Sequence, residues 1–187
     1  TEFSSVTKFN SLKLQLNNLN KYILGYTQGY LNEINGLARF ISKIGYLTDG
    51  WSQATELTKA DLTVKGVMAM AVNECNPLML TELVYGNYLD ELTFPDIVSV
   101  LALFLDVSSE ERDVNWQGNA AAPVITRYLR DMDSLEVEES RLSHTISDWK
   151  TNEYLCDLAR LWVTEHEIGL PPMLERLGIY DIQPGEF

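Results

Sequence analysis

The sequence predicts an all-α protein: a bundle of about seven helices, with at most a short strand near residues 62–72. Three observations predict this class. Apolar residues recur at spacings of three and four along most of the 187 residues, which is the period of a helix face. Prolines and glycines stand where such stretches would open and close. Only residues 61–72 have some strand character, at their start. They could form a strand or a short strand followed by a buried helix, and the sequence does not decide between these two.

Residues 1–45 are expected to form a pair of basic helices. Apolar residues from Leu12 to Tyr30 recur at roughly helical spacing, and a second set from Leu31 to Ile44 repeats at three and four residues. Gly45 then stands where a helix would stop. The polar residues 46–61 are expected to form a connection.

Two cap signals predict the next helices. Asn76 and Pro77 resemble a cap followed by a first-turn proline, with Gly86 as the stop. Residues 93–96 resemble a capping box with Asp in place of Glu. The run that follows, as far as Leu105, is apolar almost all round and is therefore expected in the core.

The last third of the sequence predicts a long connection followed by four helices. Residues 106–118 form the longest polar connection, and helical patterns resume at about 120–132, 134–149 and 151–166. A short helix over residues 171–178 opens with two prolines and closes with a glycine.

Charge divides the chain into two parts. Residues 1–44 carry five basic and two acidic side chains, whereas residues 45–187 carry nine and 25, giving a net charge of −13. We therefore expect a basic helix pair over residues 1–45 that leads into an acidic bundle over residues 46–187. This balance argues against a freestanding nucleic-acid binder, since phosphate affinity comes mainly from Lys and Arg.

Several functional classes find no support in the sequence. There is no glycine-rich phosphate loop, no nucleophile elbow and no metal-binding spacing of Cys and His, so we expect no catalytic residues and no metal site. The acidic pairs Glu110-Glu111 and Glu138-Glu139 are expected to be solvated charge. Cys75, beside Glu74 and without a nearby base, is not set up as a nucleophile.

The sequence also suggests a location. Its two cysteines make no disulfide framework and fit a reducing compartment. No apolar run reaches the roughly 18 residues of a membrane span, and the start lacks a signal-peptide pattern. We expect an intracellular protein, in the nucleus or the cytoplasm, with no membrane partner.

Four short segments carry a resemblance to a known family. They are Ile44-Gly-Tyr-Leu47, Leu62-Thr-Val-Lys-Gly66, Leu78-Met-Leu-Thr-Glu-Leu-Val-Tyr85 and Leu89-Asp-Glu-Leu92, and the apolar run to Leu105 follows them. In this order they resemble the C-terminal helical (DSHCT) domain of the Ski2-like and Mtr4-like ATP-dependent RNA helicases. The likeness is closest over residues 40–105 and looser over 150–187. Each segment by itself also fits the core and the caps of any helical bundle.

The resemblance implies an accessory role. ATP and Mg would be bound by helicase domains elsewhere in the parent polypeptide, with no cofactor in this chain. The domain would pack on that helicase core, help guide single-stranded RNA, and serve with exosome-type RNA-processing proteins. The candidates for RNA contact are Lys65, Trp116, Arg127 and Arg130, because binding of single-stranded RNA needs cationic side chains and aromatic stacking surfaces.

Two departures from the family pattern bear on this expectation. Val67 stands where the family usually has Arg after Lys-Gly, so a contact made by that Arg is missing. The chain also ends at Phe187, before the ratchet-like helix that follows in the family, and is therefore expected to be a fragment of a longer protein.

Two other functions stay open at this point. An acidic helical adaptor with exposed aromatics such as Trp51 and Trp116 would dock a basic protein and never touch nucleic acid. A small independent enzyme is the weakest alternative, because the sequence offers no catalytic constellation.

Overall fold

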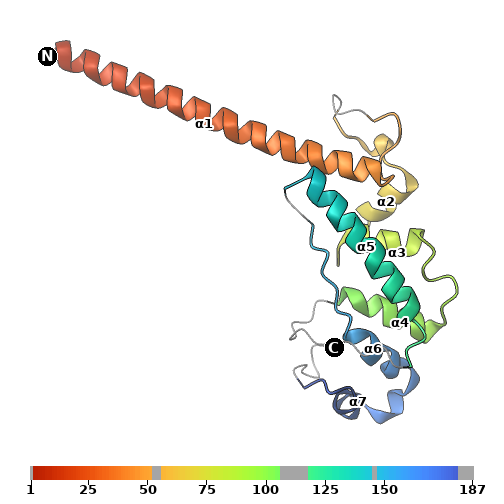
Figure 1. Ribbon diagram of the computed structural model, residues 1–187. Coiled ribbons are helices and arrows are strands. Elements are labelled where there is room, and N and C mark those ends of the chain that lie inside the picture. The colour runs from red at the N-terminus through yellow and green to blue at the C-terminus, as the bar shows by residue number, and fades with distance from the viewer. Residues whose placement is uncertain (1, 52–55, 106–117, 145–146, 181–187) are drawn as a thin grey trace.

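The computed structural model describes residues 2–51, 56–105, 118–144 and 147–180, and every regular element in these ranges is a helix (Figure 1). Three short 3-10 turns also occur, at Lys59–Asp61, Ala102–Phe104 and His166–Ile168. The all-α prediction is confirmed. The α-helices of the described residues are α1 (Glu2–Lys43), α2 (Val64–Met70), α3 (Pro77–Tyr85), α4 (Phe94–Leu101), α5 (Ala122–Leu142), α6 (Leu155–Thr164) and α7 (Leu170–Leu177).

The expected helix pair at the start is instead one helix. α1 runs without interruption over 42 residues and ends before Gly45, whose φ is 84°. Within α1 only Gly25, Gly29 and Gly36 weaken the helix, and a glycine costs about 1 kcal/mol relative to Ala but keeps its N–H group. Figure 1 shows that α1 extends far from the body formed by the other helices and carries the N-terminus at its tip.

The expected helices at 120–132 and 134–149 are also different in the structure. α5 continues through residues 132–134, where neither proline nor glycine interrupts it, and ends at Leu142. Ser143 then takes extended backbone angles. The described residues 147–152 lie outside the helices.

The predicted caps are largely confirmed. Asn76 caps α3 by accepting from the backbone N–H of Leu78 at 2.9 Å, and Gly178 closes α7 in the left-handed conformation. Thr93 begins α4, but its hydroxyl donates to the Asp96 carboxylate rather than accepting from a backbone amide. The capping box is therefore only half formed.

Residues 61–72 contain a helix rather than a strand. Leu62 pairs with Leu47 in an isolated β-bridge, and α2 begins two residues later with Thr63 as its cap. Gly66 allows a close approach of the backbone at the start of α2. A Cβ on Gly66 would lie 2.3 Å from the Tyr46 carbonyl oxygen, so only glycine fits between α2 and the end of α1.

The body has two apolar clusters. One joins α3, α4 and α5, and the other joins α4, α6 and α7 through residues such as Leu158 and Met173. α1 is fixed to this body at its C-terminal end: Phe40 is fully buried and meets Trp149 edge-on, with ring centroids 6.5 Å apart. None of the helices in the described ranges combines the length and apolar character needed to cross a membrane.

Candidate nucleic-acid interface

Two of the predicted RNA-contact residues lie together on α5. Arg127 and Arg130 are three positions apart, so their side chains share one face of the helix. Both are exposed, and the Arg130 side chain is 74% accessible. Two neighbouring guanidinium groups can each donate to phosphate oxygens, which makes this face suited to a nucleic-acid backbone.

An aromatic residue from the turn after α3 completes this group. The guanidinium carbon of Arg127 lies 4.7 Å from the centroid of the Tyr88 ring. The Tyr88 hydroxyl donates to Asp131 at 2.7 Å, and Asp131 also faces Arg130, 3.7 Å from its Nε. We call Tyr88, Arg127, Arg130 and Asp131 the α5 face.

The α5 face rests on the core and is therefore held in place. The Tyr88 ring meets the buried Tyr128 edge-on at 5.3 Å between centroids, and the Tyr128 hydroxyl donates to the Met79 carbonyl at 2.9 Å. Burial and the hydrogen bond to Asp131 raise the pKa of Tyr88 to about 12, so its phenol stays neutral at physiological pH. The face thus combines two cations, one carboxylate and one neutral aromatic ring.

Lys65 lies elsewhere, at the joint where α1, α2 and α3 meet. Its ammonium is 2.6 Å from the Glu82 carboxylate and donates to the Ile44 carbonyl at 2.9 Å. It also lies 4.7 Å from the centroid of the Tyr46 ring, and the Tyr46 hydroxyl donates to Glu82 at 3.0 Å. With 12% of its side chain accessible, Lys65 is held by protein groups. An RNA contact by Lys65 stays a prediction, and it requires this arrangement to open.

Of the two tryptophans named from the sequence, the structure describes only Trp51. Trp116 lies outside the described residues. Trp51 is only half-exposed, less open than an aromatic docking residue was expected to be. The structure therefore brings together Arg127 and Arg130 and adds Asp131 of the same helix and Tyr88. Sequence reasoning missed Tyr88 because it comes from a separate segment.

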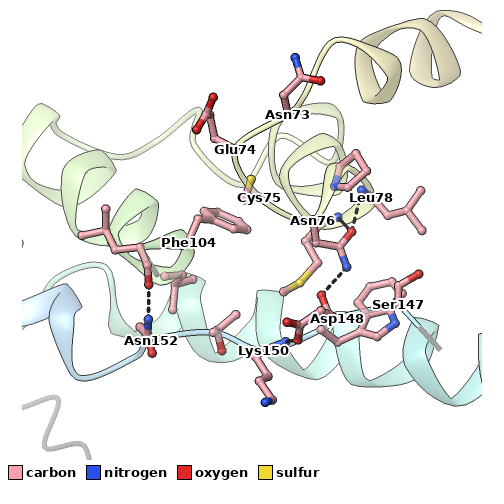
Figure 2. Close-up of a pocket in the computed structure, with 16 residues that line it drawn as sticks. Asn73, Glu74, Cys75, Asn76, Leu78, Phe104, Ser147, Asp148, Lys150 and Asn152 are labelled. Carbon is pink, nitrogen blue, oxygen red and sulfur yellow. Dashed lines mark hydrogen bonds between the residues drawn. The ribbon is translucent and has the colours of Figure 1, made fainter. Parts of the chain in front are cut away.

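The described structure contains a groove of about 1030 Å³ (Figure 2). It lies between the start of α3 and the segment 147–152, with Leu103 and Phe104 on its third side. Asn76 spans it in part, because its amide donates to the Asp148 carbonyl at 2.7 Å. Glu74, Asp148 and Lys150 contribute charges to its rim.

This groove does not bring a catalytic group together. Burial and the neighbouring Glu74 raise the pKa of the Cys75 thiol, which disfavours the reactive thiolate. Among the described residues, no cluster of three or more His, Cys, Asp or Glu side chains has the arrangement of a metal site.

One expectation about charge is wrong: Glu139 is fully buried, not solvated. Its carboxylate accepts from the Ser147 hydroxyl at 2.6 Å, the Ser147 backbone N–H at 3.0 Å and the Trp149 indole N–H at 2.7 Å. Three donors satisfy the buried carboxylate and fasten the segment after α5. The signal was its spacing: Glu139 continues the row of the buried Tyr128 and Met132 and the partly buried Leu135. Its neighbour Glu138 pairs with Lys43 of α1 at 2.5 Å.

Comparisons with known proteins bear on the central part of the chain. A family model, the DSHCT (NUC185) domain, matches residues 59–169, more than half of the chain. No curated protein matches the sequence. The matched residues include α2 to α6, and hence the α5 face and the Lys65–Glu82 pair.

Proposed function

The chain belongs to the DSHCT domain family, whose members occur in Ski2-like helicases, and we propose that it is the accessory C-terminal domain of an ATP-dependent RNA helicase of the DExH-box type. In this role it packs on the helicase core of the same polypeptide and helps to guide single-stranded RNA during unwinding, processing or decay. ATP and Mg bind in that core. The parent protein works inside the cell, in the nucleus or the cytoplasm, alongside exosome-type RNA-processing proteins.

The observation that carries the RNA-guiding part is the α5 face. Arg127 and Arg130 are exposed beside Tyr88 on a helix that is otherwise fixed in the core. Binding of single-stranded RNA combines phosphate contacts with stacking on aromatic or guanidinium planes, and this face supplies both. Because the rest of the body is strongly acidic, the face is suited to touching RNA that the helicase core already holds.

A titration of the chain with fluorescently labelled oligouridylate at low salt tests the proposal. We expect weak, salt-sensitive binding that Arg127→Ala/Arg130→Ala weakens further. If both arginines contact phosphates, the slope of log affinity against log salt falls by roughly 1.4, since each single-strand phosphate contact contributes about 0.7. Lys59→Ala/Lys150→Ala is the matched control, because it removes the same charge from two exposed lysines outside the α5 face.

The control separates site binding from general electrostatic attraction. Equal losses in the two double variants would show that only net charge matters. Absence of any salt-sensitive binding by the wild-type chain would remove the support for RNA contact and favour the acidic protein-binding adaptor.

A further inference from the structure

The α5 face contains a carboxylate that phosphate binding alone does not explain. Asp131 follows Arg130 and lies one helical turn after Arg127, so the three side chains share one side of α5. The Asp131 side chain is 44% accessible, and its Oδ1 lies 3.7 Å from the Arg130 Nε. A negative charge at this place repels phosphate and weakens a purely cationic grip on an RNA backbone.

Asp131 is held in one orientation by a neutral hydrogen-bond donor. The Tyr88 hydroxyl donates to its Oδ2 at 2.7 Å, and the Tyr88 ring is itself fixed by the edge-on contact with the buried Tyr128. An ionised carboxylate offers about four acceptor positions and no donor. The Tyr88 hydroxyl takes one of them, so both carboxylate oxygens can still accept from a ligand at the surface.

A stacking surface lies next to this carboxylate. The Arg127 guanidinium covers the Tyr88 ring, 4.7 Å from its centroid, and the Arg127 side chain is exposed. Guanidinium planes are among the surfaces on which bases of single-stranded RNA stack. Because residues four apart on a helix are neighbours, a base on Arg127 would bring its edge within reach of Asp131.

Guanine is the base whose edge suits a carboxylate. Its Watson–Crick edge presents two adjacent donors, N1–H and the N2 amino group, which match the two oxygens of a carboxylate. Adenine and cytosine place an acceptor nitrogen beside their amino group, and uracil flanks its single N–H with two carbonyl oxygens. Each of these three bases therefore sets a lone pair against the negative charge.

We propose that the α5 face selects guanine in single-stranded RNA. The base stacks on Arg127, its N1–H and N2 amino groups donate to Asp131, and Arg130 binds a neighbouring phosphate. Asp131 is then the specificity-determining residue. This inference rests on the proposed RNA contact of the α5 face and adds the base that the face prefers.

The test uses the whole chain and labelled RNAs of about nine nucleotides, within the usual length of a single-strand site. They are uridine throughout except for the central position, which is guanosine, inosine, adenosine or uridine. By fluorescence anisotropy at low salt, we expect the guanosine RNA to bind about fivefold or more tightly than the uridine RNA, as one bidentate base contact allows. Inosine keeps N1–H but lacks the N2 amino group, so its RNA should lose most of this advantage.

Two chain variants show whether Asp131 reads the base. In Asp131→Asn the amide oxygen can still accept from the Tyr88 hydroxyl, but the amide nitrogen meets the guanine donors with a donor of its own. The guanosine advantage should disappear, while all RNAs bind somewhat more tightly because a negative charge is lost. Asp49→Asn is the matched control: it removes the same charge from an exposed position outside the α5 face, and the guanosine advantage should remain.

The possible failures are distinguishable. Equal affinity for the guanosine and uridine RNAs would overturn base selection and leave the RNA contact standing. A guanosine advantage that survives in Asp131→Asn would overturn the role of Asp131 in the same way. Absence of binding to any of the RNAs would overturn both base selection and the proposed RNA contact.

Discussion

At the scale of single residues, the Lys65–Glu82 pair shows how a packing motif acts. The two side chains are 12% and 15% accessible and join α2 to α3, while Lys65 also holds the last carbonyl before Gly45. The sequence alone does not identify the partner of Glu82. Lys65, which was expected to face RNA, is that partner because the Gly66 contact draws α2 onto the end of α1.

Lys65→Met should therefore destabilise the fold. Loss of the ammonium leaves Glu82 largely buried without its cation, which costs about 3 kcal/mol in the free energy of unfolding. Lys65→Met/Glu82→Leu should recover about half of that loss, since it removes the uncompensated charge. Urea denaturation measures both. A single variant as stable as wild type would contradict this role, and a loss of RNA affinity by the stable double variant would restore Lys65 as an RNA contact.

A second residue-scale prediction concerns Asp96. A hydrogen bond from Thr93, and the Arg160 guanidinium 3.0 Å away, hold the pKa of the Asp96 carboxyl below its ordinary value of 3.8 against the opposing effect of burial. Because the pKa is lowered in the folded state, the stabilisation is complete above pH 3.8 and is lost as pH falls through the lowered value.

Asp96→Asn should then lower the free energy of unfolding by about 2 kcal/mol at pH 7. The difference from wild type should shrink as pH falls below 3.8. Asp90→Asn, at an exposed position, is the control and should change stability by less than about 0.5 kcal/mol. A difference between Asp96→Asn and wild type that stays constant with pH would show that the charge of Asp96 is not what matters.

At the scale of elements, local signals predicted where most helices begin and end, but not how they join. Asn76, Gly45 and Gly178 mark helix ends in the sequence and in the structure alike. The break expected near residue 31 does not exist. The boundary between the two apolar stretches does not interrupt the backbone hydrogen bonds of the helix. The helix expected at 134–149 stops at Leu142 because Glu139 draws Ser147 and Trp149 back towards α5. That is a tertiary effect, which spacing alone does not reveal.

The crossing of α1 and α5 gives a prediction at this scale. A Cβ on Gly36 would lie 2.1 Å from the Leu142 carbonyl oxygen, and a backbone atom cannot move aside cheaply. Gly36→Ala should force the helices apart and destabilise the protein by about 2 kcal/mol. Gly29→Ala, on the same helix with no atom within 4 Å, should stabilise it by about 0.5–1 kcal/mol. Thermal unfolding of the two variants compares them, and equal shifts would contradict the close crossing.

At the scale of the whole molecule, the basic and the acidic parts of the sequence correspond to two different parts of the structure. The basic segment is a projecting helix, and the acidic remainder is the body into which it packs (Figure 1). The all-α class and the family were predictable, because helical periodicity and an ordered set of packing motifs can be recognised in the sequence without knowledge of the contacts. The α5 face was only half predictable. Its arginines are adjacent on one helix, but Tyr88 reaches them from a turn some forty residues earlier.

The most direct test of the RNA-guiding role is to crosslink 4-thiouridine-containing single-stranded RNA to the chain and map the attachment sites by mass spectrometry. The account predicts crosslinked peptides from α5 around Arg127 and Arg130 and from the turn with Tyr88, lost in Arg127→Ala/Arg130→Ala. Crosslinks confined to the lysines of α1, or spread evenly over the body, would contradict it.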